Sequence, residues 1–83
     1  MNYLRIDDKI REKFYLDSEI FISGNREIII ENCKRIEEYN EVFIRIVSGS
    51  LHINIWGDNL KAYDFRTDSL VIRGKISRIE FEN

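Results

Sequence analysis

The sequence predicts a small, single-domain, all-β protein: an antiparallel meander that closes into a barrel or a sandwich. Two observations predict this class. From Glu19 onward, apolar side chains recur at every second position, which is the side-chain period of a β-strand. Turn-forming Gly, Asn, Asp and Ser residues interrupt these runs about every 8–10 residues, the spacing typical of all-β domains. A chain of 83 residues has no room for the long helical crossovers that parallel strands need.

An internal repeat keeps a second architecture open. The segments "IFISG" (20–24), "HINIWG" (52–57) and "LVIRG" (70–74) each end an alternating run with glycine. Such repeats also occur in β-solenoids, so a short β-solenoid is the alternative fold. Because the copies are so few, the curled antiparallel meander is favoured.

Residues 1–18 follow a different pattern and are predicted to be an N-terminal leader. Ile6, Ile10 and Phe14 are four residues apart, which places them on one side of a helix. The spacing therefore predicts a short amphipathic helix over about 6–15. An irregular leader is the rival interpretation, because isolated helices of this length are marginal in water.

The β domain is predicted to span residues 19–83, and its first half reads as three strands and a loop. The alternation of Ile20 and Ile22 predicts the first strand, and the β-branched run at 27–30 predicts the second. The polar segment "NCKRIEEYN" (32–40) lacks alternation, so we expect a bend or loop there. Clean alternation over 42–47 then predicts a third strand.

The second half is predicted to begin with a tight hairpin at Ser48-Gly49-Ser50. Leu51, Ile53 and Ile55 continue the inward-facing set after this turn. The elements expected next are a strand over 51–56, a turn at 57–59, a strand over 60–65, a turn at 67–69, a strand over 70–73 and the closing segment "KISRIEF" (75–81).

Two parts of the repeat require an irregularity within the strand. "LKAYDF" and "ISRIEF" follow Gly57 and Gly74, and in both the alternation slips by one residue. A strand keeps its two faces only if the spacing stays even, so we expect a β-bulge, bend or break near Lys61-Ala62 and near Ser77-Arg78. The glycines, Gly24 included, are predicted to mark bends or close approaches of another backbone segment.

The chain offers no residue set suited to catalysis or metal binding. His52 is its only histidine and Cys33 its only cysteine, whereas a metal site needs three or four ligands. No third group is evident that would orient a Cys33–His52 pair as a nucleophile and base. We therefore predict no enzyme activity, no cofactor and no metal.

Composition and charge narrow the setting further. The net charge of −2 gives no electrostatic reason to bind nucleic acid, so none is expected. No segment approaches the roughly 20 apolar residues of a membrane-spanning helix, so no direct membrane span is expected. A single cysteine excludes an internal disulfide and fits a reducing, cytoplasmic compartment.

Both faces of the predicted sheet carry large apolar groups, whereas a soluble antiparallel sheet usually keeps one face polar. Either these groups form an ordinary internal core, or part of the second face contacts another chain, a second copy included. The apolar residues of the second face are Phe21, Ile29, Phe43, Val47, Trp56 and Val71. The candidate binding residues on it are Phe43, Arg45, His52, Asn54, Trp56 and Arg73.

The segment "IENCKRIEEY" (30–39), with "SGN" before it and "LHINIWGDNLKAYDFRTDSLVIRGKISRIEF" after it, resembles the YabP/YqfC family of sporulation proteins, the YqfC branch in particular. Two positions depart from the family pattern: Cys33 stands where a histidine is common, and Ser18 where a proline is expected. The positions that match are Gly24, Glu31, Asn32, Lys34, Ile36, Tyr39, Gly57, Leu60, Gly74, Ile76, Ile79 and Phe81.

The resemblance implies a non-enzymatic protein of the mother cell, with no cofactor, that acts in endospore assembly or morphogenesis through protein contacts. It also implies a membrane-bound partner of the YqfD type, which would hold the protein at the forespore membrane, and Gly24, Glu31, Asn32, Gly57 and Gly74 as structural motif residues. The alternative is a ligand-binding β module that recognises lipid headgroups, glycan or nucleic acid through Arg45, His52, Trp56 and Arg73.

Overall fold

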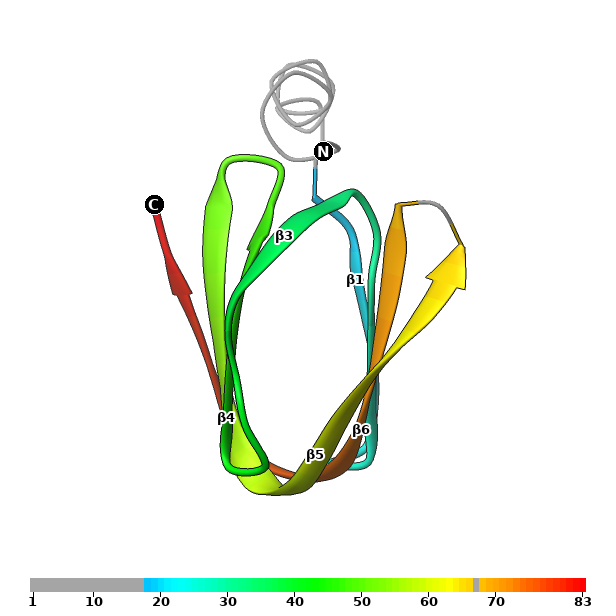
Figure 1. The fold of residues 1–83 in the computed structure, drawn as a ribbon, viewed down its shortest axis with the longest axis vertical. Coiled ribbons are helices and arrows are strands. Elements are labelled where there is room, and N and C mark those ends of the chain that lie inside the picture. Colours follow the sequence, from blue (N-terminus) through cyan, green and yellow to red (C-terminus); the bar gives the residue numbers. More distant parts are fainter. Residues whose placement is uncertain (1–17, 67) are drawn as a thin grey trace, which may run out of the picture.

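The computed structural model describes residues 18–66 and 68–83. Within these ranges the chain forms a six-stranded antiparallel sheet and no helix, which confirms the all-β prediction (Figure 1). The strands follow the order β1-β2-β6-β5-β4-β3 across the sheet. Their bounds are β1 (Ile20–Ser23), β2 (Glu27–Ile30), β3 (Cys33–Tyr39), β4 (Phe43–Ser48), β5 (Leu51–Arg66) and β6 (Ser69–Glu82). The helix predicted over about 6–15 lies outside the described residues.

The sheet is folded over on itself because β5 and β6 are long and bend together (Figure 1). Residues 51–56 of β5 pair with β4 and with the second half of β6, and β3 completes this first layer. Residues 61–66 of β5 pair with the first half of β6, which pairs with β2, and β1 completes the second layer. The two layers face each other and enclose the core between them (Figure 1).

The bend is built from two bulges, one on each long strand. Ser77 is an extra residue on β6, because Trp56 pairs with Arg78 while Gly57 pairs with Ile76. On β5, the two residues Asn59 and Leu60 stand opposite the single residue Gly74 of β6, so β5 has the extra residue here. Asn59 has a left-handed φ of 52°. The irregularity predicted near Ser77-Arg78 is thus confirmed. The one predicted near Lys61-Ala62 is found at Asn59-Leu60, directly before the predicted position. Bulges increase the local twist and bend, which turns the hairpin from one layer into the other.

Two glycines allow the backbones to meet at this bend. A Cβ at Gly57 would lie 2.1 Å from the carbonyl oxygen of Lys75. Gly74 has a φ of 148°, and a Cβ there would lie 2.8 Å from the carbonyl oxygen of Asn59. Only glycine fits two backbones this close together. The prediction that these glycines mark bends and close approaches is confirmed.

The core consists almost entirely of β-branched residues from the inward faces of both layers. Side chains of this kind suit a pleated surface, and burying each isoleucine contributes on the order of 1.5–3 kcal/mol. The first layer supplies four isoleucines, the second layer supplies three isoleucines and Leu70, and the bend adds Leu60 and Ile76. The buried cluster is Ile28, Ile30, Ile44, Ile46, Ile53, Ile55, Leu60, Leu70, Ile72 and Ile76.

The connection from β2 to β3 carries the chain from the second layer to the far edge of the first in two residues. This short step is possible only because the layers face each other. Asn32 adopts a left-handed φ of 56°, and the carbonyl oxygen of Glu31 accepts a 2.7 Å hydrogen bond from the buried Ser48 hydroxyl. The Cys33 N–H donates to the carbonyl oxygen of Asp68 at 2.9 Å, which ties the start of β3 to the β5–β6 turn. The backbone of Glu31 and Asn32 thus forms the crossing between the two layers.

Several predictions about the fold are wrong. The sheet is not closed into a barrel, because β1 and β3 are its two ends and do not pair with each other. The β-solenoid alternative is also wrong, since every strand pairing is antiparallel. The loop expected at 32–40 is strand β3, whose polarity reflects an exposed edge position. The turn expected at 57–59 lies inside the continuous β5, where the bulge takes its place.

Candidate binding surface

The outward side of the first layer brings most of the predicted binding residues together. Ile44, Ile46 and Ile53 point into the core, so their neighbours along β4 and β5 point outward. The pairing register arranges the outward residues in three rows across β4, β5 and β6. The rows are Phe43–Trp56–Arg78, Arg45–Asn54–Glu80 and Val47–His52–Glu82.

The first row forms an aromatic stack that a cation covers. The ring centroids of Phe43 and Trp56 lie 4.9 Å apart, with the ring planes tilted by 46°. The guanidinium carbon of Arg78 lies 4.5 Å from the centroid of the Trp56 ring. Both contacts have the geometry of favourable aromatic and cation–π interactions. Phe43 and Trp56 remain partly exposed, so the stack presents a rigid apolar area to solvent.

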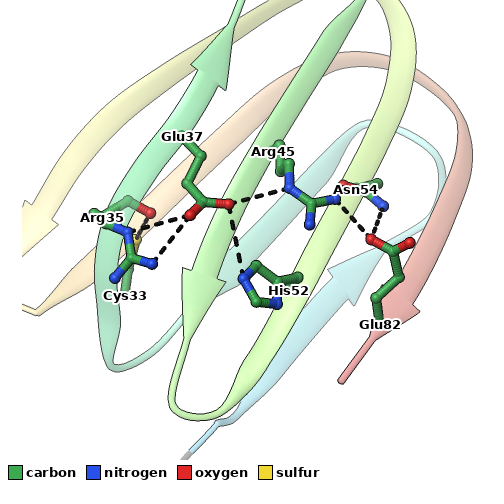
Figure 2. Close-up of polar contacts among 7 residues, drawn as sticks. All are labelled: Cys33, Arg35, Glu37, Arg45, His52, Asn54 and Glu82. Carbon is green, nitrogen blue, oxygen red and sulfur yellow. Dashed lines mark hydrogen bonds and ion pairs between the residues drawn. The ribbon is translucent and has the colours of Figure 1, made fainter.

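The other two rows hold a network of charged and polar side chains around Arg45 (Figure 2). Its Nη1 donates to Asn54 Oδ1 at 2.6 Å and to Glu82 Oε1 at 2.7 Å. Its Nε donates to Glu37 Oε1 at 3.1 Å. The Asn54 side chain is 4% exposed and also donates to Glu82, at 3.1 Å, so its buried amide is satisfied on both sides.

Glu37 is the second centre of this network (Figure 2). It accepts from Arg35 at 3.0 Å as well as from Arg45, and His52 Nε2 lies 3.8 Å from Glu37 Oε1. Glu37 comes from β3, the segment that the sequence suggested was a loop. For that reason its contact with Arg45 could not be predicted.

The contacts within this network shift the pKa values of Glu37, Glu82 and Arg45 in the direction that favours the charged form of each side chain. For Glu37, desolvation raises the pKa, but hydrogen bonds from Arg35 and Arg45 outweigh it and leave the pKa below its ordinary value. Hydrogen bonds from Arg45 and Asn54 lower the pKa of Glu82. The bond to Glu82 likewise raises the pKa of Arg45, against desolvation. The two carboxylates and the Arg45 guanidinium are therefore all charged at neutral pH and attract each other.

Arg73 lies apart from this surface. It belongs to the first half of β6, on the outward side of the second layer, where its Nε donates to Glu27 Oε2 at 2.7 Å. Its guanidinium carbon also lies 5.6 Å from the centroid of the Tyr63 ring. Five of the six predicted binding residues thus share one face, and the sixth belongs to the opposite one. Arg73 and Trp56 both point outward, but the bend separates their layers.

Five residues of the surface were missed by sequence reasoning: Arg35, Glu37, Arg78, Glu80 and Glu82. Arg78 and Glu82 lie opposite Trp56 and His52 on the closing strand. Their places follow from the register of β6 once the extra residue at Ser77 is known. The sequence predicts the bulge, but the two side chains can be placed only if the β5–β6 residue pairs on its far side are assigned with the one-residue shift included.

Within residues 18–66 and 68–83, no group of three or more His, Cys, Asp or Glu residues could hold a metal ion. Burial raises the pKa of the Cys33 thiol, which favours the protonated form over the nucleophilic thiolate. The same residues contain no helix long and apolar enough to cross a membrane.

A shallow hollow lies away from this surface, beside the bend. It has a volume of about 450 Å³ and is lined by the β3–β4 turn and the part of β5 that follows the bulge, with Tyr39, Leu60 and Tyr63 among its residues. The Tyr39 hydroxyl accepts a hydrogen bond from the Ala62 N–H at 2.9 Å. This bond occupies a backbone donor on the open edge of β5 and ties the end of β3 to the strand after the bend.

Residues 16–83 match the family model described as the YabP family. The proteins of that family are associated with sporulation. No curated protein and no solved structure matches the chain.

Proposed function

Because this chain belongs to the YabP family of sporulation-associated proteins, we propose that it is a non-enzymatic binding module that acts through protein contacts in endospore assembly or morphogenesis. Its docking surface is the outward side of the first layer, formed by the Phe43–Trp56–Arg78 row and the network around Arg45. Its partner is a membrane-bound protein of the YqfD type, which would hold the module at the forespore membrane on the mother-cell side.

The observation that carries the proposal is that the cations of this surface already have acidic partners. Arg45 contacts Glu37 and Glu82, and Arg78 donates to Glu80 at 2.8 Å. A phosphate or another anionic ligand would have to displace these carboxylates before it could bind, because recognition of phosphate depends on available Arg and Lys donors. A partner protein that contacts the aromatic stack and forms hydrogen bonds with the rim can bind without displacing these carboxylates.

The aromatic row provides the anchor that such an interface requires. Trp, Tyr and Arg are enriched among the few residues that carry most of the binding energy in protein interfaces. Trp56 has this character: it is large, partly exposed, and held in place by Phe43 and Arg78. The surrounding polar network resembles the solvated rim of an interface.

The test is a pull-down from sporulating cells with the tagged full chain as bait. Trp56→Glu is expected to lose the membrane-protein partner that the wild type captures. The matched control is Tyr63→Glu, which makes the same kind of change at a 45% exposed aromatic on the other layer and is expected to retain the partner. Far-ultraviolet circular dichroism must show that both variants remain folded.

Two outcomes would contradict the proposal. Equal capture by folded Trp56→Glu and wild type would exclude this surface as the docking site. A saturable change in Trp56 fluorescence on titration with anionic lipid vesicles, glycan or nucleic acid, without capture of a protein, would favour the ligand-binding alternative. Trp56 is the only tryptophan in the chain, so the fluorescence reports directly on this face.

A further inference from the structure

The second half of β6 has one side without a partner strand. On that side, β2 pairs with β6 only along Leu70–Arg73. The N–H groups of Gly74 and Ile76 then donate to carbonyl oxygens in the β1–β2 turn, at 3.2 and 2.7 Å. From Ser77 to Glu82, no strand in the described part of the chain pairs with this side of β6. The first layer therefore ends in an open strand edge (Figure 1).

This edge carries apolar side chains that edge strands normally avoid. Phe81 and Ile79 pair with the core residues Ile53 and Ile55, so they extend the inward apolar face to the rim of the layer. Phe81 is 51% exposed. Natural proteins protect open edges with irregular backbone, proline or inward-pointing charges, because an exposed regular edge is a template for pairing with another chain. The region after Ser77 is regular and has no proline and no inward-pointing charge; its charged residues Arg78, Glu80 and Glu82 lie on the outward face.

The other open edges are less suited to pairing. The edge strand β3 has two register irregularities, one between Cys33 and Arg35 and one between Ile36 and Glu38. Such irregularities twist an edge away from an approaching strand. The edge of β5 after the bend has its Ala62 N–H occupied by the Tyr39 hydroxyl, and β1 has only four residues.

The charged residues along β6 indicate which chain could pair with this open edge and in which register. We propose that the edge of residues 77–82 pairs antiparallel with the same edge of a second copy of this chain, with Ile79 opposite the partner's Ile79. In this register Arg78 stands opposite the partner's Glu80, and Glu80 stands opposite the partner's Arg78. Opposite charges directly across a strand pair are stabilising, and like charges are destabilising.

The neighbouring registers fail the same criterion. Centring the pair on Glu80 would place two glutamates opposite each other, and centring it on Arg78 would place two arginines opposite each other. Within each chain Arg78 already donates to Glu80 at 2.8 Å, so the four charged groups of the seam would alternate in sign. The two first layers would then form one continuous sheet, with the apolar side chains of both edges on its inward face.

This inference concerns self-association through an edge, and it is independent of the partner proposed for the outward surface. Light scattering after size-exclusion chromatography should find the full-length wild type as a dimer at high protein concentration. Arg78→Glu and Glu80→Arg should each weaken the dimer, by at least tenfold in dissociation constant. The double charge swap should recover most of the loss, because each new charge again meets its opposite.

Cross-linking tests the register directly. In a Cys33→Ser background, Ile79→Cys should form a covalent dimer under mild oxidation, because directly opposed residues bring two Cβ atoms within disulfide range. Phe81→Cys, two residues away, would stand opposite the partner's Ser77 and should cross-link far less. A wild type that stays monomeric at every concentration would overturn the proposal. So would a dimer in which the two cysteine variants cross-link equally, or one that Arg78→Glu leaves unchanged.

Discussion

Gly57→Ala tests whether the bend between the layers depends on close contact between two backbones. The added Cβ would lie 2.1 Å from the carbonyl oxygen of Lys75 and 2.9 Å from Leu60 Cδ2, whereas real Cβ atoms essentially never come within 3.0 Å of another heavy atom. The nearest atom belongs to the backbone, so a side-chain rotation cannot relieve the clash. The paired strands must separate where Gly57 faces Ile76.

Forcing an extra carbon into a packed site typically costs about 1–3 kcal/mol, and a backbone clash falls at the upper end or above. We therefore expect Gly57→Ala to lower the free energy of unfolding by about 3 kcal/mol. A domain this small has roughly 4–12 kcal/mol in total, so the variant would lose about a quarter to three quarters of its stability. Its denaturation midpoint in urea should fall well below that of the wild type.

Gly24→Ala is the matched control. A Cβ at Gly24 meets nothing within 4 Å, but its φ of 55° is left-handed, which costs an alanine about 1–2 kcal/mol. Urea unfolding followed by circular dichroism measures both variants against the wild type. If Gly57→Ala proves as stable as the wild type, or more stable than Gly24→Ala, the account of the bend is wrong.

Two further predictions concern the core and the outward network. Ile53→Ala removes a fully buried side chain from the core between the layers and should cost about 2–5 kcal/mol in urea unfolding; a loss below about 1 kcal/mol would mean that the layers do not pack on each other. The folded-state pKa values of Glu37 and Glu82 lie below their unfolded value of 4.5, so the stability from their ionisation is fully present above about pH 4.5 and is lost as the pH falls through the lower folded values. Replacing both with glutamine should flatten the acid limb of a stability-against-pH profile, and an unchanged acid limb would show that the network does not form in solution.

The sequence was most informative where alternation is regular. The strand over 42–47 and the hairpin at Ser48-Gly49-Ser50 appear as β4, its turn and the start of β5, because a period of two and a glycine turn determine them locally. The slips in alternation also located the bulges to within a few residues. These features depend on neighbours along the chain, and that is the information a single sequence contains.

The rest could not be predicted because it depends on contacts between distant segments. Strand β3 is polar and lacks regular alternation, since it lies at an edge with two irregularities, so its sequence resembles that of a loop. Missing β3 also meant missing Glu37, one of the two centres of the network. Arg73 was grouped with Trp56 because both point outward, but only the bend determines that they belong to different layers.

The two proposals have a joint consequence for assembly. A dimer formed along β6 would present two copies of the outward surface on one continuous sheet. If both copies dock at once, the second binding event is intramolecular. The avidity for a membrane-bound partner then rises, although each docking surface makes only the contacts it makes alone. A variant that loses the dimer but keeps both the Phe43–Trp56–Arg78 row and the network around Arg45 intact would then bind the same partner more weakly.

The central structural claim is that one sheet folds over at paired bulges, so that the start of β3 meets the β5–β6 turn. Nuclear magnetic resonance tests it most directly, through the amide proton of Cys33, which donates to the carbonyl oxygen of Asp68 at 2.9 Å. We expect this amide to exchange slowly with solvent and to show a nuclear Overhauser contact with the region of Asp68. Rapid exchange and no such contact, with the strands at 51–56 and 70–73 intact, would mean that the layers do not face each other and that the account is wrong.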